Sequence, residues 1–210
     1  MDNSIQNIAL LFSLYLRPTL LNQIARIFAA TSSKTPLLLE GPPGIGKTHV
    51  VTQVCKLLSK DCERINMSAD TSLDQLIGCI IPRCIDGRRV FEWQDGKVVD
   101  ALRNHRWILF NELNLASPEV LEGLIPLFYR GSKEFIVPSI NEHVDTSSAL
   151  IFATMNPATI GRGRSKLPRS ISNLFTIVQL EDYKEDELRI ILSDLFRFDI
   201  NKLTVNNEQL

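Results

Sequence analysis

Cysteine, histidine and long apolar segments are all scarce in this sequence of 210 residues. No two of the four cysteines are spaced as a Cys-x-x-Cys pair, and the three histidines are scattered, so a zinc site is not expected. Sparse cysteine use is typical of proteins whose thiols stay reduced in the cytosol or nucleus. The apolar run at residues 8–16 is shorter than the roughly 20 residues of a membrane-spanning helix, and no basic segment precedes it. The sequence therefore predicts neither export nor insertion into a membrane.

An excess of charge of either sign is also missing. Lysine and arginine number 23 and aspartate and glutamate 24, so the chain as a whole has no general attraction for nucleic acid or an anionic membrane. Hydrophobic residues make up 44% of the chain, and a chain of this length buries roughly 70% of its unfolded surface. Disorder, collagen and a coiled coil are excluded for most of the sequence, which can fold without a metal or a disulfide.

Short apolar segments alternate with segments of helical periodicity. The spacing predicts core strands at residues 36–40, 63–66, 107–110, 149–154 and 175–180, and an edge strand at 135–137. Helices are expected within 1–30 and at 47–59, 71–77, 97–104, 117–128 and 188–195. Residues 80–95 contain Pro82 and Gly87 and predict an irregular insertion or a hairpin. This alternation is typical of an α/β fold with a five-stranded parallel sheet between helices.

Two of the expected helices carry start signals. Ser117 is the predicted N-cap of the helix at 117–128, with Pro118 and Glu119 in its first turn. Pro126 should kink that helix or loosen its last turn. Thr71 and Asp74 are expected to form a variant of the capping box at the helix 71–77.

A glycine-rich loop follows the first predicted strand. It consists of Gly41, Pro42, Pro43, Gly44, Ile45, Gly46, Lys47 and Thr48, and it satisfies the pattern G-x-x-x-x-G-K-[ST]. The glycines allow backbone N–H groups to turn toward a phosphate, and the next helix directs its positive end at the anion. Lys47 is expected to bind the β- and γ-phosphates of ATP, and the Thr48 hydroxyl to bind Mg²⁺. The alternative, a surface turn with an incidental lysine, does not account for the strand before the loop and the amphipathic helix after it.

Polar side chains end two further predicted strands. Asn111 and Glu112 follow the strand 107–110, where ATPases with a phosphate loop carry an acidic pair that faces the nucleotide. Glu112 is expected to be the general base that activates the attacking water. Asn111 replaces the usual aspartate and, as a neutral oxygen donor, is expected to hold Mg²⁺ more weakly. Asn156 is expected to hydrogen-bond the water and the γ-phosphate. The alternative for these residues is a solvated strand end or a simple Asn-Pro turn.

In this order, the phosphate loop, the acidic strand end and the polar strand end resemble the core of an AAA+ ATPase. The sequence is more similar still to the midasin branch, the giant dynein-related ATPases of large ribosomal subunit assembly. The similar stretches are residues 36–48, 64–73, 91–96, 107–117 and 161–170, within a match that spans about residues 20–190. The Asn-Leu-Ala-Ser sequence at 114–117 and the Gly-Arg…Leu-Pro-Arg-Ser segment at 161–170 are fairly specific to that branch.

The resemblance implies a P-loop NTPase of AAA+ type that binds ATP and Mg²⁺. In the midasin family, six AAA+ modules of one polypeptide form a ring, and ATP hydrolysis removes assembly factors from pre-60S ribosomal particles in the nucleolus and nucleoplasm. The implied partners are neighbouring modules and that particle, the implied location is the nucleus (the cytoplasm if the resemblance to midasin fails), and no membrane is involved. The implied domains are an N-terminal helical segment at 1–34, an AAA+ core at 35–180 and the start of a truncated helical lid at 181–210.

Two positions depart from the family pattern. The first is Asn111, where the family usually has aspartate. The second is Leu174, where the family usually has an arginine. That arginine resembles an arginine finger, which contacts the γ-phosphate bound by a neighbouring module. Leucine cannot supply charge to phosphoryl transfer, so activation of a neighbour by this chain is not expected. A second hypothesis is therefore a structural module of a ring that binds ATP with little or no hydrolysis. A third is a stand-alone chaperone ATPase that resembles the MoxR group.

A basic cluster precedes the last predicted strand. It consists of Arg162, Arg164, Lys166 and Arg169, with glycines between them. Two interpretations are open: contact with RNA or a neighbouring module's nucleotide, and an ordinary solvated loop. No aromatic residue is interleaved with these side chains, so a stacking platform for single strands is not supported.

Overall fold

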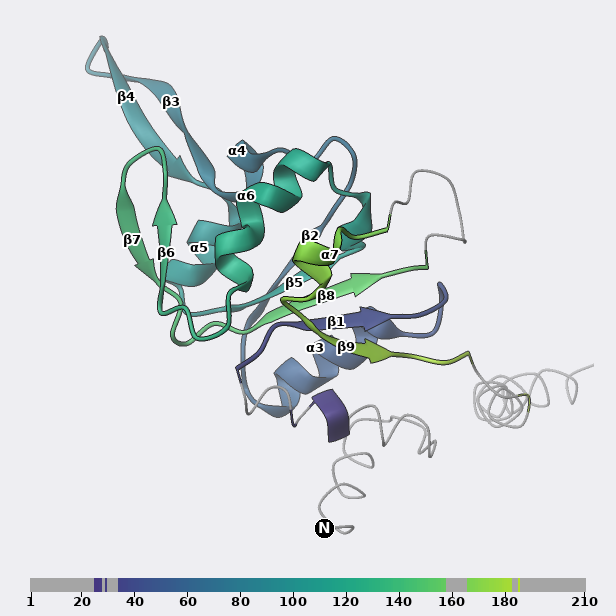
Figure 1. The fold of residues 1–210 in the computed structure, drawn as a ribbon. Coiled ribbons are helices and arrows are strands. Elements are labelled where there is room, and N and C mark those ends of the chain that lie inside the picture. Colours follow the sequence, from purple (N-terminus) through teal and green to yellow (C-terminus); the bar gives the residue numbers. More distant parts are fainter. Residues whose placement is uncertain (1–24, 28, 30–33, 158–165, 183–184, 186–210) are drawn as a thin grey trace, which may run out of the picture.

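The computed structural model describes residues 25–27, 29, 34–157, 166–182 and 185, and its centre is a five-stranded parallel sheet. The strand order is β2-β5-β8-β1-β9, and every neighbouring pair is parallel. The five strands are β1 (Leu37–Glu40), β2 (Cys62–Asn66), β5 (Trp107–Asn111), β8 (Ile151–Met155) and β9 (Thr176–Gln179). The predicted α/β fold with five parallel core strands is confirmed (Figure 1).

Helices cover both faces of this sheet (Figure 1). They are α3 (Lys47–Leu57), α4 (Leu73–Leu76), α5 (Lys97–Arg103), the 3₁₀ helix η1 (Leu113–Leu115), α6 (Pro118–Phe128) and α7 (Arg169–Ser172). On β1, Leu37 and Leu39 pack in the cluster that contains α3, whereas Leu38 packs in the cluster that contains α5 and α6. Because successive strand residues point to opposite faces, an unbroken apolar strand buries side chains in two layers.

Ser117 and Pro118 start α6 as predicted, and the start of α4 differs from the prediction. Ser117 Oγ accepts a hydrogen bond from the Val120 N–H, and Pro118 occupies the first turn. Pro126 lies inside α6, which ends at Phe128. The capping box of α4 is formed by Ser72 and Gln75, so the expected pairing of Thr71 with Asp74 is wrong. Thr71 Oγ1 instead accepts from the Ser68 N–H, in the turn before the helix.

Two antiparallel hairpins extend from the sheet domain. Of the two predictions for residues 80–95, an irregular insertion or a hairpin, the hairpin is confirmed: β3 (Gly78–Ile85) and β4 (Arg88–Asp95) pair regularly and project from the molecule (Figure 1). Phe91 on this hairpin is 70% exposed. The expected edge strand is β6 (Glu134–Val137), but it pairs with β7 (Glu142–Asp145) in a separate sheet. The apolar pattern did not predict β7, because only Val144 of its four residues is buried.

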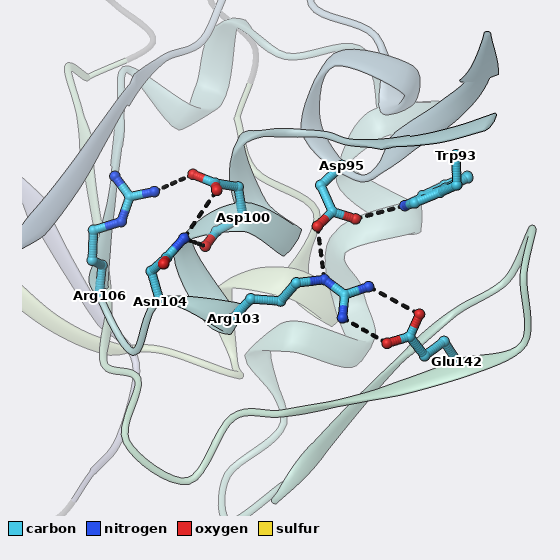
Figure 2. A network of polar contacts seen from close by, with 7 residues as sticks. All are labelled: Trp93, Asp95, Asp100, Arg103, Asn104, Arg106 and Glu142. Atoms are coloured by element: carbon cyan, nitrogen blue, oxygen red, sulfur yellow. Dashed lines mark hydrogen bonds and ion pairs between the residues drawn. The ribbon is translucent and has the colours of Figure 1, made fainter. Parts of the chain in front are cut away.

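Arg103 of α5 connects the two hairpins (Figure 2). Its Nε lies 2.7 Å from Asp95 Oδ2, at the end of β4. Its Nη1 and Nη2 donate to the two carboxylate oxygens of Glu142 on β7, at 2.6 and 2.9 Å. Trp93 Nε1 donates to the other oxygen of Asp95. One guanidinium group therefore links α5 to the base of the β3–β4 hairpin and to the turn end of the β6–β7 hairpin.

We expect Glu142→Gln to lower the melting temperature near neutral pH and to have no effect in acid. Arg103 lowers the pKa of Glu142 by hydrogen bonding and by its charge, so the pair stabilises the fold only while Glu142 is ionised. The stabilisation is complete above the ordinary glutamate pKa of about 4.3 and is lost as the pH falls through the lower pKa of the folded state. Because the pair is exposed, the difference near neutral pH is expected to be no more than about 4 °C.

Thermal unfolding between about pH 7 and pH 3, followed by circular dichroism, measures this difference. Glu122→Gln, which neutralises an exposed carboxylate on α6, is the matched control. A difference in melting temperature between wild type and Glu142→Gln that stays constant from about pH 7 to pH 3 would contradict a stabilising role for the ionised Arg103–Glu142 pair.

The four cysteines are free thiols, and two of them lie together. A hydrogen bond with Cys55 and, next, burial raise the pKa of the Cys62 thiol. Cys62 is therefore protonated at neutral pH and is not a reactive thiolate.

Both ends of the chain lie mostly outside the described residues. Residues 25–27 and 29 are helical, as expected within 1–30, and Ile27 is fully buried beside α3. The helix expected at 188–195 lies outside the described residues, and the domain boundaries proposed at residues 34 and 180 stay predictions. No helix that the structure describes combines the length and apolar composition that crossing a bilayer requires.

Candidate functional site

The loop between β1 and α3 requires glycine at several positions. Gly44 and Gly46 both have a φ of 83°, in the left-handed region that favours glycine. At Gly41 a Cβ would lie 2.5 Å from both Ile45 Cδ1 and the Leu180 carbonyl oxygen, so a side chain does not fit. Gly46 is the N-cap of α3 and has no side chain to cap it. The N-terminus of α3 therefore carries no capping side chain and, through its dipole, favours an anion.

Lys47 begins α3 and is almost fully buried, with 8% exposure. Its ammonium donates to the carbonyl oxygens of Gly41 at 2.7 Å and Pro42 at 2.6 Å. It also donates to Asn156 Oδ1 at 2.7 Å. A buried cation needs such acceptors or an anionic ligand, so phosphate oxygens can exchange for these carbonyls.

Thr48 and Asn111 meet at the position predicted to hold a metal ion. Thr48 Oγ1 donates to Asn111 Oδ1 at 2.7 Å, and Thr154 Oγ1 donates to the same oxygen at 2.8 Å. Because the Thr48 hydrogen is used in this bond, the lone pairs of its oxygen remain for a cation. A hydroxyl and an amide oxygen from adjoining elements match the oxygen ligands that Mg²⁺ prefers, and the carboxylate of the usual aspartate is absent.

Glu112 and Asn156 line the same cavity and contact each other. Asn156 Nδ2 donates to Glu112 Oε1 at 3.1 Å, and Asn156 is only 3% exposed. Glu112 follows β5 with a φ of 57°, and its N–H donates to Thr154 Oγ1 at 3.2 Å. Asn156 therefore hydrogen-bonds both the cation of the phosphate loop and the predicted general base.

These side chains line a single cavity of about 470 Å³ at the carboxyl ends of β1, β5 and β8. Every predicted catalytic and metal-binding residue lines it, and so do Pro43, Gly44 and Gly46 of the loop. Gly41, Pro42 and Ile45 are not part of its lining, although two of them accept hydrogen bonds from Lys47. An ammonium group, a helix N-terminus without a side-chain cap and a hydroxyl around such a volume fit a polyphosphate with a divalent cation.

A second cavity, of about 170 Å³, lies at the other end of the sheet. It is lined by residues such as Lys34, Leu127 and Ile151 and contains none of the predicted site residues. Ligands of open α/β sheets bind outside the carboxyl ends of the strands, which favours the larger cavity as the site.

Leu174 is only partly buried, and two of the four residues of the basic cluster lie outside the described residues. The Leu174 side chain packs against the core and, being apolar, offers no charge to a neighbouring molecule. Arg162 and Arg164 lie outside the described residues. Lys166 and Arg169 are exposed near the start of α7. The choice between a binding patch and a solvated loop stays a prediction.

Several polar residues of the site were not predicted. They are Arg64 and Asn66 on β2, Thr154 on β8, and Asn114, whose Nδ2 donates to the Asn156 carbonyl oxygen at 3.0 Å. A weak signal existed for Thr154, because it is the one polar residue in the apolar run of β8. For Arg64 and Asn66, the signal is two polar residues in alternate positions of a strand whose end adjoins Asn111.

Comparisons with known proteins agree with this geometry. The family described as AAA domain (dynein-related subfamily) matches residues 36–175. The midasin of Giardia intestinalis is 37% identical over 180 residues, which are 85% of this chain and 4% of that protein. The midasin of Dictyostelium discoideum is 34% identical over 181 residues, 85% of this chain and 3% of that protein.

The fold also matches a solved structure. The crystal structure of a proposed ATPase from Cytophaga hutchinsonii aligns with a TM-score of 0.58 at 21% identity, over 90% of this chain and 58% of that one. At this identity the match supports the fold alone. The chain spans only a few per cent of the midasins, so it is similar to one module of them. The family match over most of the sheet domain shows that this chain belongs to the dynein-related subfamily of AAA domains.

Proposed function

We propose that this chain is an ATP-binding module that hydrolyses ATP. The observation that carries the proposal is the convergence of Lys47, Thr48, Glu112 and Asn156 in one cavity, at the end of the sheet where the phosphate loop lies. Each of these side chains has a role in phosphoryl transfer, and they come from three different segments of the sequence.

In this proposal Lys47 binds the phosphates, together with the N–H groups at the start of α3. Glu112 accepts the proton of the attacking water as general base, and Asn156 orients that carboxylate through its 3.1 Å hydrogen bond. Thr48 and Asn111 would hold Mg²⁺, which would supply charge neutralisation at the phosphates.

A second candidate is a structural module that binds ATP with little or no hydrolysis. Asn111 and Leu174 favour it, since one removes a negative charge from the metal position and the other packs against the core. No feature of the described residues favours a stand-alone MoxR-like chaperone.

We further propose, from the similarity to midasin, that the module works inside a larger AAA+ ring in the nucleus. Its neighbours would be other AAA+ modules, and its work would be the removal of assembly factors from pre-60S ribosomal particles. The near-neutral charge of the chain is compatible with protein neighbours as its main partners.

A single-turnover assay with the protein in excess over γ-labelled ATP and Mg²⁺ separates the two candidates. Release of labelled phosphate faster than in the protein-free reaction supports hydrolysis. Bound ATP that is not converted, both for the chain alone and beside a partner module, supports the structural candidate.

A further inference from the structure

The cavity contains a second cation for which the proposed function has no role. Arg64 on β2 lines the cavity with Lys47, Thr48, Asn111 and Glu112. Arg64 Nε donates to Asn66 Oδ1 at 3.2 Å, and both residues lie on the exposed edge strand. The two terminal nitrogens of Arg64 make no hydrogen bond or ion pair with any described residue.

A chain of hydrogen bonds sets the orientation of Arg64. Asn111 Oδ1 accepts from Thr48 and Thr154, so the Asn111 amide nitrogen must point the other way. That nitrogen donates to Asn66 Oδ1 at 3.3 Å, and the same oxygen accepts from Arg64. Register places Asn66 directly opposite Asn111 across the β2–β5 pair. An aspartate at 111 would have no such donor, so the asparagine itself supports the position of Arg64.

The substitution at 111 also changes the charge of the cavity. Its charged lining side chains are Lys47, Arg64 and Glu112, so cations outnumber the one carboxylate. An aspartate at 111 would balance them and would attract a divalent cation. With asparagine, the site attracts a phosphate more strongly and a metal ion less strongly.

We propose that Arg64 binds the nucleotide phosphates on the side where Thr48 and Asn111 lie. Its guanidinium supplies part of the positive charge that Mg²⁺ supplies in ATPases with an aspartate at this position. Binding of ATP by this chain then depends only weakly on Mg²⁺. A guanidinium suits this role, because its terminal nitrogens can donate to two phosphate oxygens at once. The inference rests on the proposed binding of ATP and not on its hydrolysis.

The test is the dissociation constant for ATP, measured by calorimetry on the 210-residue chain in excess Mg²⁺ and in excess EDTA. For the wild type we expect the dissociation constant in EDTA to exceed the one in Mg²⁺ by less than about tenfold.

Arg64→Gln removes a charge-assisted contact. It is expected to raise the dissociation constant in EDTA by about tenfold or more, and the dissociation constant in Mg²⁺ by less. Arg64→Lys keeps the charge but loses the paired donors, so its dissociation constant in EDTA is expected to lie between those of wild type and Arg64→Gln. Asn111→Asp is expected to increase the dependence on Mg²⁺.

Arg88→Gln is the matched control, because Arg88 is an exposed arginine on the β3–β4 hairpin. It is expected to leave both constants unchanged. Circular dichroism of each variant confirms that the fold is retained. An equal ratio of the two constants in wild type and Arg64→Gln would overturn the inference and leave ATP binding intact. A wild type that binds ATP in neither condition would instead overturn the proposed function.

Discussion

Lys47→Ala is expected to raise the dissociation constant for ATP by about 100-fold or more. The ammonium is buried beneath the phosphate loop and held by three oxygens, two of which belong to the loop backbone. Charge-assisted hydrogen bonds to two phosphates contribute about 3 kcal/mol together, and each 1.4 kcal/mol corresponds to about tenfold in affinity. Calorimetric titration of the variant with ATP measures the change.

The matched control for this prediction is Lys56→Ala. Lys56 is an exposed lysine in the last turn of the same helix, far from its N-terminus, and its loss is expected to leave affinity unchanged. Melting temperatures of both variants distinguish lost binding from lost folding. ATP affinity that is the same in folded Lys47→Ala and wild type would refute the phosphate site itself.

Glu112→Gln is expected to slow single-turnover hydrolysis by about 100-fold or more, with ATP affinity changed by less than about threefold. Glutamine keeps the shape of the side chain and an oxygen that can accept from Asn156 Nδ2, but it cannot take a proton from water. A general base contributes about 100-fold to 10,000-fold in rate, so the effect falls on turnover rather than on binding. Rapid-quench measurement of phosphate release gives the rate.

Glu122→Gln, on the exposed side of α6, controls for the loss of a carboxylate elsewhere. Hydrolysis that proceeds at the wild-type rate in Glu112→Gln would show that another group activates the water. A wild type that binds ATP without any turnover would favour the structural candidate, for which Asn111 and Leu174 already provide a reason.

The phosphate loop and the strand ends were predictable because each depends on a short contiguous segment. The loop needs glycines, a lysine and a hydroxyl in fixed order, and its flanking strand and helix follow from apolar periodicity. The start of α6 was predictable for the same reason, since Ser117 and Pro118 act within one turn. The start of α4 was not, because Thr71 and Ser72 are both suitable N-caps and only the path of the backbone selects one.

The network around Asn111 was beyond prediction. Arg64, Asn66 and Thr154 became part of the site only when β2, β5 and β8 paired in parallel with their carboxyl ends at one edge. Strand order is not encoded in any one segment, and a register shift of one residue would turn Asn66 away from Asn111. The β6–β7 pairing and the Arg103 contacts depend on the same long-range packing.

The sequence by itself determined that this chain is a phosphate-loop α/β protein with a lysine, a hydroxyl and a glutamate suited to ATP. Those features are local, and their chemistry follows from residue type and spacing. The tertiary structure alone decided that Asn111 is held by two threonines, that its amide supports Asn66, and that Arg64 shares the cavity. The reason is physical: hydrogen bonds between α3 and the ends of β2, β5 and β8 join residues that are 42 to 63 positions apart in the chain, and only the folded domain brings them within 3 Å or so of each other.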